Sequence, residues 1–209
     1  MNGFERRKEQ KKENIRRSAI ELFKTYGFGK VSIGDIARRA NVSHVTIYNH
    51  FGSKEELVQD VIKTVISGLV ASSREIIEGE KPFLEKLELI ILNKSELAAQ
   101  YRGELMKMAG GYNPEVQLFI ESLWQKEVDP LLDILIEEGK KLGYIKKELS
   151  QQSIRFYFEL IRKGAFANAE IINTIKMNKQ LAYDLNYLFL FGLVEKEGGR
   201  EDNFKLDIT

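Results

Sequence analysis

The residues between Val31 and Leu57 combine small polar, aromatic and apolar side chains at helical spacing. A helix over residues 43–50 turns by about 100° per residue. If Ile47 faces inward, Val45 and Asn49 face outward, one turn apart, and Thr46 and Tyr48 flank them. An asparagine amide can pair with adenine through two hydrogen bonds, and a valine side chain can contact a thymine methyl group. This face therefore predicts readout of base edges in DNA.

A second set of residues favours phosphate. Ser32 and Ser43 place hydroxyl and free backbone N–H groups at the beginnings of two predicted helices, where anions are stabilised. Lys54 lies in the first turn of the next helix, where its charge opposes the helix dipole, which suggests an external anion. The serines also serve as helix caps, and His50 lies close enough to the inward direction to pack against the core instead. The predicted DNA-contacting residues are Ser32, Ser43, His44, Val45, Thr46, Tyr48, Asn49, His50 and Lys54.

Other chemistry is poorly supported. The chain has no cysteine, so disulfides and thiolate metal sites are excluded. His44 and His50 are the only two histidines and lie six residues apart, which does not suit a metal pair on one helix face. We predict no metal and no cofactor.

Charge is distributed unevenly along the chain. Residues 1–54 hold 12 Lys and Arg against 5 Asp and Glu, whereas residues 55–209 hold 20 against 26. A basic head on an acidic body is typical of a protein that binds a polyanion at one end.

Helical spacing dominates the whole chain, and the capping signals agree with it. Ser32 and Asp35 form a predicted capping box, Asn41 suits a left-handed turn, and Ser53 with Glu56 predicts the start of a long helix. A helix opened by Pro114 is expected to kink before Pro130. We therefore predict an all-α fold of about nine helices. Residues 1–54 would form a three-helix DNA-binding head with a helix-turn-helix, and residues 55–209 a larger helical domain for effector binding and dimerisation.

These residues also resemble a known family. The run IxxxAxxLFxxxGF, which begins at Ile15, and the run SxxxIAxxAxVSxxTIYNHFxSKEEL, which begins at Ser32, are similar to the N-terminal domain of TetR-type transcriptional regulators. The resemblance covers about residues 12–60. It implies a helical homodimer whose heads enter the major grooves of a palindromic double-stranded DNA operator. Val45 and His44 depart from the pattern, because the family often has a small residue and a lysine at these positions.

The body offers two further predictions. The last predicted helix, over about residues 178–196, is apolar on nearly all sides, and the helix before it, over about residues 150–173, carries an apolar stripe. Two such helices from each of two chains predict a four-helix dimer interface, with ordinary packing in a monomer core as the alternative. The interface residues would include Tyr157, Ile161, Ala165, Leu188 and Phe191. The resemblance implies a small-molecule effector, and apolar and aromatic side chains typically line such pockets. Plain core packing is the alternative for each candidate: Tyr101, Met106, Met108, Tyr112, Phe119, Leu123 and Trp124.

The sequence therefore predicts a DNA-binding transcriptional regulator, best read as a repressor that a small molecule releases from its operator. An enzyme with a DNA-binding head is disfavoured, because the body has no histidine, no cysteine and no phosphate-binding loop. An activator, or an adaptor that binds a protein partner, stays open. The charged N-terminus and the absence of a stretch long enough to span a bilayer predict a cytoplasmic protein without membrane contacts.

Overall fold

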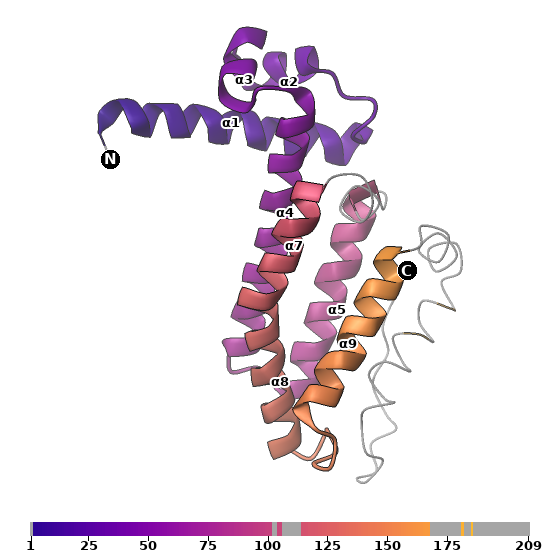
Figure 1. The fold of residues 1–209 in the computed structure, drawn as a ribbon. Helices are drawn as coiled ribbons and strands as arrows, with labels where there is room; N and C mark the ends of the chain where they lie inside the picture. The colour runs from indigo at the N-terminus through magenta and orange to yellow at the C-terminus, as the bar shows by residue number, and fades with distance from the viewer. Residues whose placement is uncertain (1, 102–103, 106–113, 168–180, 182–184, 186–209) are drawn as a thin grey trace. The chain divides into compact units, whose positions relative to one another are not determined.

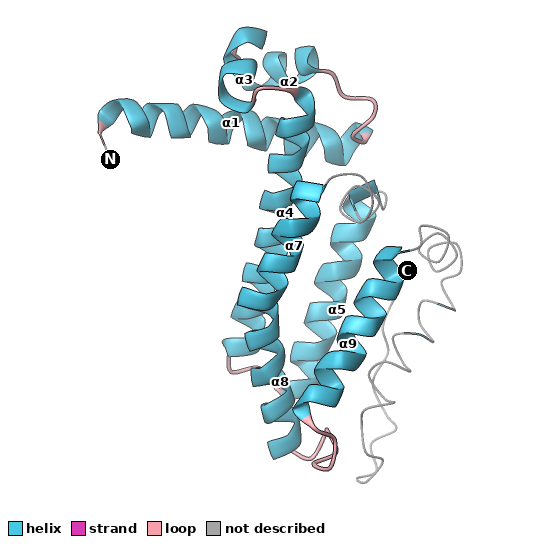
Figure 2. Ribbon diagram, in the orientation of Figure 1, coloured by secondary structure: helices cyan, strands magenta, loops and turns pink. Residues whose placement is uncertain are grey.

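The computed structural model describes residues 2–101, 104–105, 114–167, 181 and 185 of the chain. Every regular element within these residues is helical, which confirms the predicted all-α fold (Figures 1 and 2). The elements are α1 (Gly3–Tyr26), α2 (Ile33–Ala40), α3 (His44–Phe51), α4 (Lys54–Glu78), α5 (Phe83–Gln100), α7 (Pro114–Leu123), a π-helical turn η1 (Trp124–Val128), α8 (Asp129–Lys141) and α9 (Gln151–Ala167).

The chain packs as two compact units. The first comprises Met1–Ala71 and Asn93–Ser122, and the second comprises Ser72–Leu92 and Leu123–Thr209. The first unit therefore joins the three-helix head to the beginning of α4 and to residues that follow much later in the sequence. The boundary predicted after residue 54 does not coincide with a boundary between these units, and the division of functions at that residue stays a prediction.

Local signals position the helices of the head. The side-chain oxygen of Ser32 accepts the Asp35 N–H at 3.2 Å, and Asp35 in turn accepts the Ser32 N–H at 2.9 Å. This reciprocal pair is the predicted capping box, and it satisfies N–H groups that the helix itself leaves unpaired. Asn41 ends α2 in the left-handed conformation, with φ 53° and ψ 51°. The tight turn between α2 and α3 follows from this residue.

One hydrophobic core holds the head together. Ile15 of α1, Ile36 of α2, Ile47 of α3 and Leu57 of α4 are all completely buried. Each helix is too short, or too charged on its other faces, to be stable in isolation, so this shared burial is what fixes α3 in place. The orientation of the outward face of α3 is therefore determined by Ile47 at its centre.

Residues far along the chain complete the same core. Tyr101, Leu105 and Val116 are buried in one cluster with Phe23 and Phe28 of the head. The ring of Tyr101 stacks on that of Phe28 with centroids 5.9 Å apart.

A hydrogen bond between a side chain and the backbone accompanies this packing. The Glu104 carboxylate accepts the Phe28 N–H at 2.9 Å. Gly27 makes the approach possible, because its φ of 84° suits glycine and a Cβ atom there would lie 3.0 Å from the Glu104 carboxylate.

Where the sequence predicts a kink before Pro130, the second unit has a π-helical turn. The Asp129 N–H bonds to the Trp124 carbonyl, five residues back, so η1 leads into α8 through one wide turn. Pro130 explains this turn, because its ring cannot be accommodated by a regular α-helical hydrogen bond to the residue four positions earlier. Nearby, the buried ammonium of Lys86 donates to both Glu138 carboxylate oxygens, at 2.8 and 3.0 Å.

Candidate nucleic-acid interface

The helix α3 presents an exposed face with no acidic side chain. Val45 is 66% exposed and Tyr48 is 48% exposed, and Asn49 is exposed beside them, whereas Ile47 is completely buried. His44 is exposed at the N-terminal end. The structure thus places Val45, Tyr48 and Asn49 on the side that the helical spacing predicts. Amide, hydroxyl and methyl groups on one short helix suit base edges in a major groove.

The N-terminal ends of α2 and α3 are occupied by their own caps. The Ser43 side-chain oxygen accepts the Thr46 N–H at 3.1 Å and lies 2.9 Å from the Thr46 hydroxyl. Hydrogen bonds from Ser32, with the Arg38 charge, lower the pKa of Asp35 below its ordinary value. Ser32 and Ser43 are exposed, so a phosphate can approach both of them, and the carboxylate of Asp35 lies next to Ser32. Of the two capped ends, that of α3 is therefore the more favourable for an anion.

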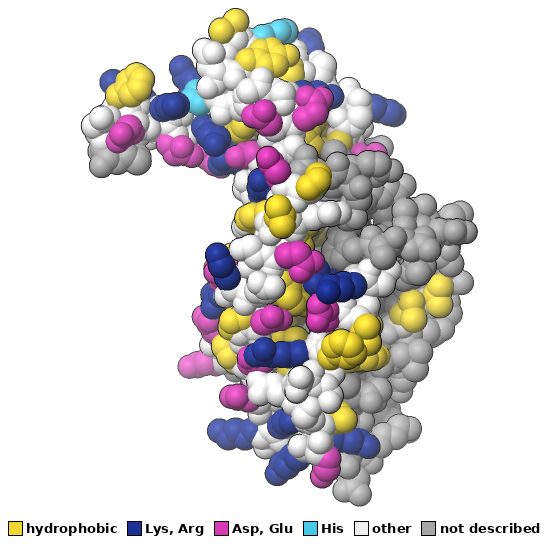
Figure 3. All heavy atoms as spheres, in the orientation of Figure 1, with side chains coloured by type: hydrophobic (Ala, Val, Ile, Leu, Met, Phe, Trp, Pro, Cys, Tyr) yellow, Lys and Arg dark blue, Asp and Glu magenta, His cyan; other side chains and the backbone are white. Residues whose placement is uncertain are grey.

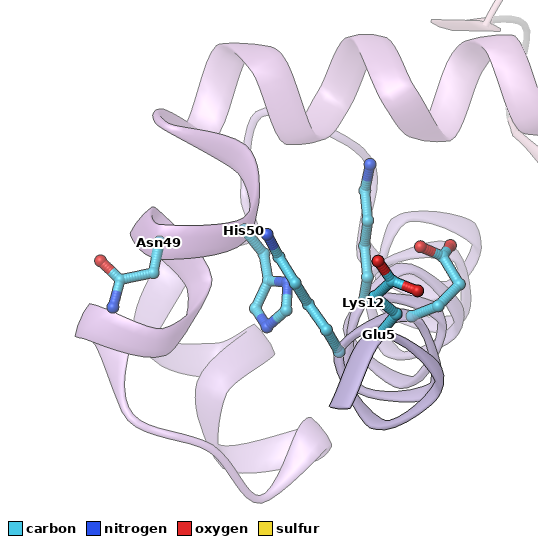
Figure 4. A pocket seen from close by; sticks show the side chains of 6 residues that line it. Glu5, Lys12, Asn49 and His50 are labelled. Carbon is cyan, nitrogen blue, oxygen red and sulfur yellow. The ribbon is translucent and has the colours of Figure 1, made fainter. Parts of the chain in front are cut away.

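His50 and Lys54 lie at the far end of α3. Both residues are half-buried. Figure 4 shows His50 reaching from α3 toward Glu5 and Lys12 of α1, while Asn49 is turned away from them. Nδ1 of His50 is buried and has no hydrogen-bond partner. The sequence left open whether His50 contacts DNA or packs against the core. In the structure its side chain faces α1 rather than the centre of the core.

The charges around His50 predict a pH effect on stability. Burial, and then the positive charges of Lys8, Lys11 and Lys12, lower its pKa, while Glu9 raises it. Because the unfolded chain then binds the proton more readily, the wild-type protein should lose stability relative to His50→Gln as the pH falls through the ordinary histidine value of about 6.5. Urea unfolding of both proteins above and below that pH checks this. Equal pH dependence would show that His50 is not perturbed in the folded state.

The predicted effector residues fall into separate places. Tyr101 belongs to the core of the first unit, and burial raises its pKa to about 12. Phe119 lies in the same unit, with the Lys63 ammonium 5.9 Å from its ring centroid. In the second unit, Leu123 is half-buried and the Arg162 guanidinium lies 4.7 Å from the centroid of the Trp124 ring. Met106, Met108 and Tyr112 lie outside the described residues.

Two of the predicted dimer residues lie on an exposed apolar face of α9. Tyr157 is 38% exposed and Ile161 is 41% exposed. Phe156 and Leu160, which the sequence analysis did not single out, are also exposed, and they widen this face. Ala165 lies in the last turns of α9, and Leu188 and Phe191 lie outside the described residues.

Sequence reasoning missed the structure of the N-terminal residues. The sequence analysis treats them only as part of the basic head, but α1 begins at Gly3 and extends past α2 and α3 (Figure 1). The Asn2 side chain caps this helix by accepting the Glu5 N–H at 2.9 Å, and Glu5 accepts the Asn2 N–H at 3.0 Å. An N-terminal asparagine followed three residues later by glutamate is a form of the capping-box signal that could have revealed this start.

The described part of the chain offers neither a candidate metal site nor a candidate membrane-spanning helix. No group of three or more His, Cys, Asp or Glu side chains there is arranged to hold a metal ion. None of the helices in the same part of the chain has both the length and the apolar character that a membrane span requires.

Comparisons with known proteins agree on the nature of the head. Residues 15–61 match the family model described as bacterial regulatory proteins, tetR family. The transcriptional repressor KstR2 of Mycobacterium tuberculosis is 24% identical over 63% of this chain and 67% of its own length. The nucleoid occlusion factor SlmA of Vibrio atlanticus is 24% identical over 70% of this chain and 79% of its own length.

Solved structures show the same fold. The transcriptional regulator FadR of Bacillus subtilis, solved in complex with stearoyl-CoA, has a TM-score of 0.60 and 23% identity, and the match covers 87% of this chain and 98% of FadR. KstR2 is named as a transcriptional repressor and FadR as a transcriptional regulator, whereas SlmA is named as a nucleoid occlusion factor. Residues 15–61 therefore form the N-terminal DNA-binding domain of the tetR family of bacterial regulatory proteins, and the chain as a whole has the fold seen in FadR.

Proposed function

We propose that this regulator is a repressor that binds a palindromic operator as a homodimer and is released by a small-molecule effector. The observation that carries the proposal is the exposed, acid-free face of α3, held outward by the fully buried Ile47. Val45, Tyr48 and Asn49 on this face would read base edges, while Ser43 and Lys54 at its ends would contact phosphates.

The exposed apolar face of α9 supports the dimer. Phe156, Tyr157, Leu160 and Ile161 expose between 38% and 59% of their surface. Four adjacent large apolar residues are costly to leave in water, and a patch of this kind typically marks a protein–protein interface. Two copies of α9 packed on one another would give the twofold symmetry that a palindromic operator requires.

The attachment of Tyr101 and Glu104 to the head supports control by an effector. Glu104 accepts the Phe28 N–H, and Tyr101 stacks on Phe28, so both residues contact the chain just after the end of α1. The predicted effector residues Met106, Met108 and Tyr112 follow them in sequence. A ligand that displaced Tyr101 and Glu104 from Phe28 would bind the free and the DNA-bound protein with different affinities. By that difference it would change the affinity of the protein for DNA.

An activator or adaptor is the second candidate. SlmA, a relative of similar identity, is named as a nucleoid occlusion factor rather than as a transcriptional repressor, so a body that does not serve a small-molecule-controlled repressor is an alternative. The head would act in the same way in both cases. The class of molecule that changes the affinity for DNA therefore separates the two candidates.

The test begins with DNA fragments selected by the purified protein from its own genome. Preference for a palindromic fragment over a random duplex of equal length, together with sedimentation as a dimer, is the expected result. A panel of small hydrophobic compounds is then screened for release of the fragment. Equal affinity for both duplexes, or sedimentation as a folded monomer, would overturn the proposal. Release by no compound would favour the protein-partner alternative.

A further inference from the structure

The N-terminal half of α1 lies outside the core of the head. The buried residues of this helix, which begins at Gly3, all lie in its second half: Ile15, Ser18, Ala19 and Phe23. Residues 2–11 are all exposed. A helix that continues for about three turns without burying anything is not explained by the packing of the head, because isolated turns of this length are marginally stable in water.

The exposed half of α1 is basic on one particular face. At about 100° per residue, Lys8, Lys11 and Lys12 lie within roughly 60° of the direction of Ile15, whereas Arg6 and Arg17 lie about 160–180° from it. The face that packs against the head in the second half of α1 therefore carries lysines in the first half. Dark blue basic side chains, with magenta acidic ones among them, lie along this part of the head (Figure 3).

These lysines surround the end of α3. A groove of about 460 Å³ between α1 and α3 is lined by Glu5, Lys8, Glu9, Lys12, Asn49 and His50 (Figure 4). The charges of Lys8, Lys11 and Lys12 are close enough to His50 to lower its pKa. The basic face of α1 is therefore continuous with the face of α3 that carries Asn49.

The two outermost lysines have no partner of their own. Lys12 lies 3.6 Å from Asp60 and 5.4 Å from the centroid of the Phe51 ring, so it is fixed to the head. Lys8 and Lys11 make no ion pair or hydrogen bond with any residue that the structure describes. Of the nearby acids, Glu5 is turned back onto the Asn2 N–H, and Glu13 is bound to Arg16. Glu9 is the acid that remains beside the groove.

We propose that Lys8 and Lys11 form a second DNA contact, which binds phosphates of the duplex beside the half-site that α3 reads. The partner is double-stranded DNA, recognised by charge alone, because lysine ammonium groups bind phosphate as point charges and carry no base information. The proposal rests on the proposed function of α3. It adds that each head covers more of the duplex than its recognition helix, so the operator includes flanking base pairs whose sequence is not read.

The test compares two double variants with the same loss of charge on the same helix. Lys8→Gln/Lys11→Gln removes the proposed contacts, and Arg6→Gln/Arg17→Gln is the matched control on the opposite face. Binding to the selected genomic fragment is measured over a range of salt concentrations. Each lost phosphate contact should reduce the slope of log affinity against log salt by about 0.9. We expect a reduction of about 1.8 per head for the lysine pair and a clearly smaller one for the arginine pair.

Two further arms sharpen the result. Lys8→Arg/Lys11→Arg keeps both charges and should retain the wild-type slope, and circular dichroism should show wild-type helix content for all variants. Shortening the fragment to the base pairs between and including the two half-sites should abolish the difference between the lysine and arginine pairs. Equal slopes for the two Gln pairs on the long fragment would overturn the inference. Loss of sequence preference by the wild-type protein would instead overturn the proposed function, so the two failures are distinguishable.

Discussion

Replacing Asn49 by alanine should reduce the preference of the protein for its operator over a random duplex by about 1–3 kcal/mol, which is the discrimination that one bidentate side chain–base pair provides. Asn49 is exposed on α3 and is turned away from α1, so its removal leaves the core of the head unchanged. Fluorescence anisotropy with the selected fragment and with a random duplex of equal length measures both affinities. The loss should appear for the selected fragment only.

Lys54→Ala is the matched comparison. Lys54 lies in the first turn of α4, where it would contact phosphate rather than a base. Its removal should weaken the binding of both duplexes alike, with a reduction of about 0.9 in the salt slope. If Asn49→Ala weakened both duplexes equally, Asn49 would be a backbone contact, and the assignment of the reading face would be wrong.

Replacing Ile47 by alanine should lower the free energy of unfolding by about 2–5 kcal/mol, as is typical for a fully buried branched residue. Ile47 is completely buried, and it is one of only two buried residues in the eight-residue helix α3. The cavity would remove the main contact that fixes this helix. Urea unfolding followed by circular dichroism measures the change, and DNA binding should weaken at temperatures where the head is no longer fully folded.

Ile47→Val is the control, because it removes one methylene group and should cost only about 0.5–1.5 kcal/mol. A loss below 1 kcal/mol for Ile47→Ala would contradict the packing described here. It would mean that the turn and the caps, rather than the core, hold α3 in position.

Much of the head could be predicted from the sequence because its signals are local. The capping box of Ser32 and Asp35, the left-handed Asn41 and the inward Ile47 each depend on residues within one or two turns. The π-helical turn before Pro130 follows from the chemistry of one residue. The helical form of residues 3–14 was missed because they have no apolar stripe, and periodicity of apolar residues was the signal used for the other helices.

The body was less predictable because its contacts are between residues distant in sequence. An aromatic residue at helical spacing can line a pocket or fill a core, and only the neighbours decide. Tyr101 has Phe28 as its neighbour, 73 positions earlier in the chain, and no local pattern indicates that contact. Similarly, nothing in the sequence near Trp124 indicates that Arg162 covers its ring.

The burial of Tyr101, Leu105 and Val116 in one cluster with Phe23 and Phe28 has a thermodynamic consequence. A fragment that ended where the family match ends, at residue 61, would expose part of the apolar surface that keeps the DNA-reading helix folded. The DNA-reading helix and the residues around Tyr101, Leu105 and Val116 are therefore stabilised by the same hydrophobic core. A molecule that binds near Tyr101, Leu105 or Val116 therefore changes the free energy of unfolding of the head. Unfolding of the head in turn changes the binding free energy of that molecule by the same amount.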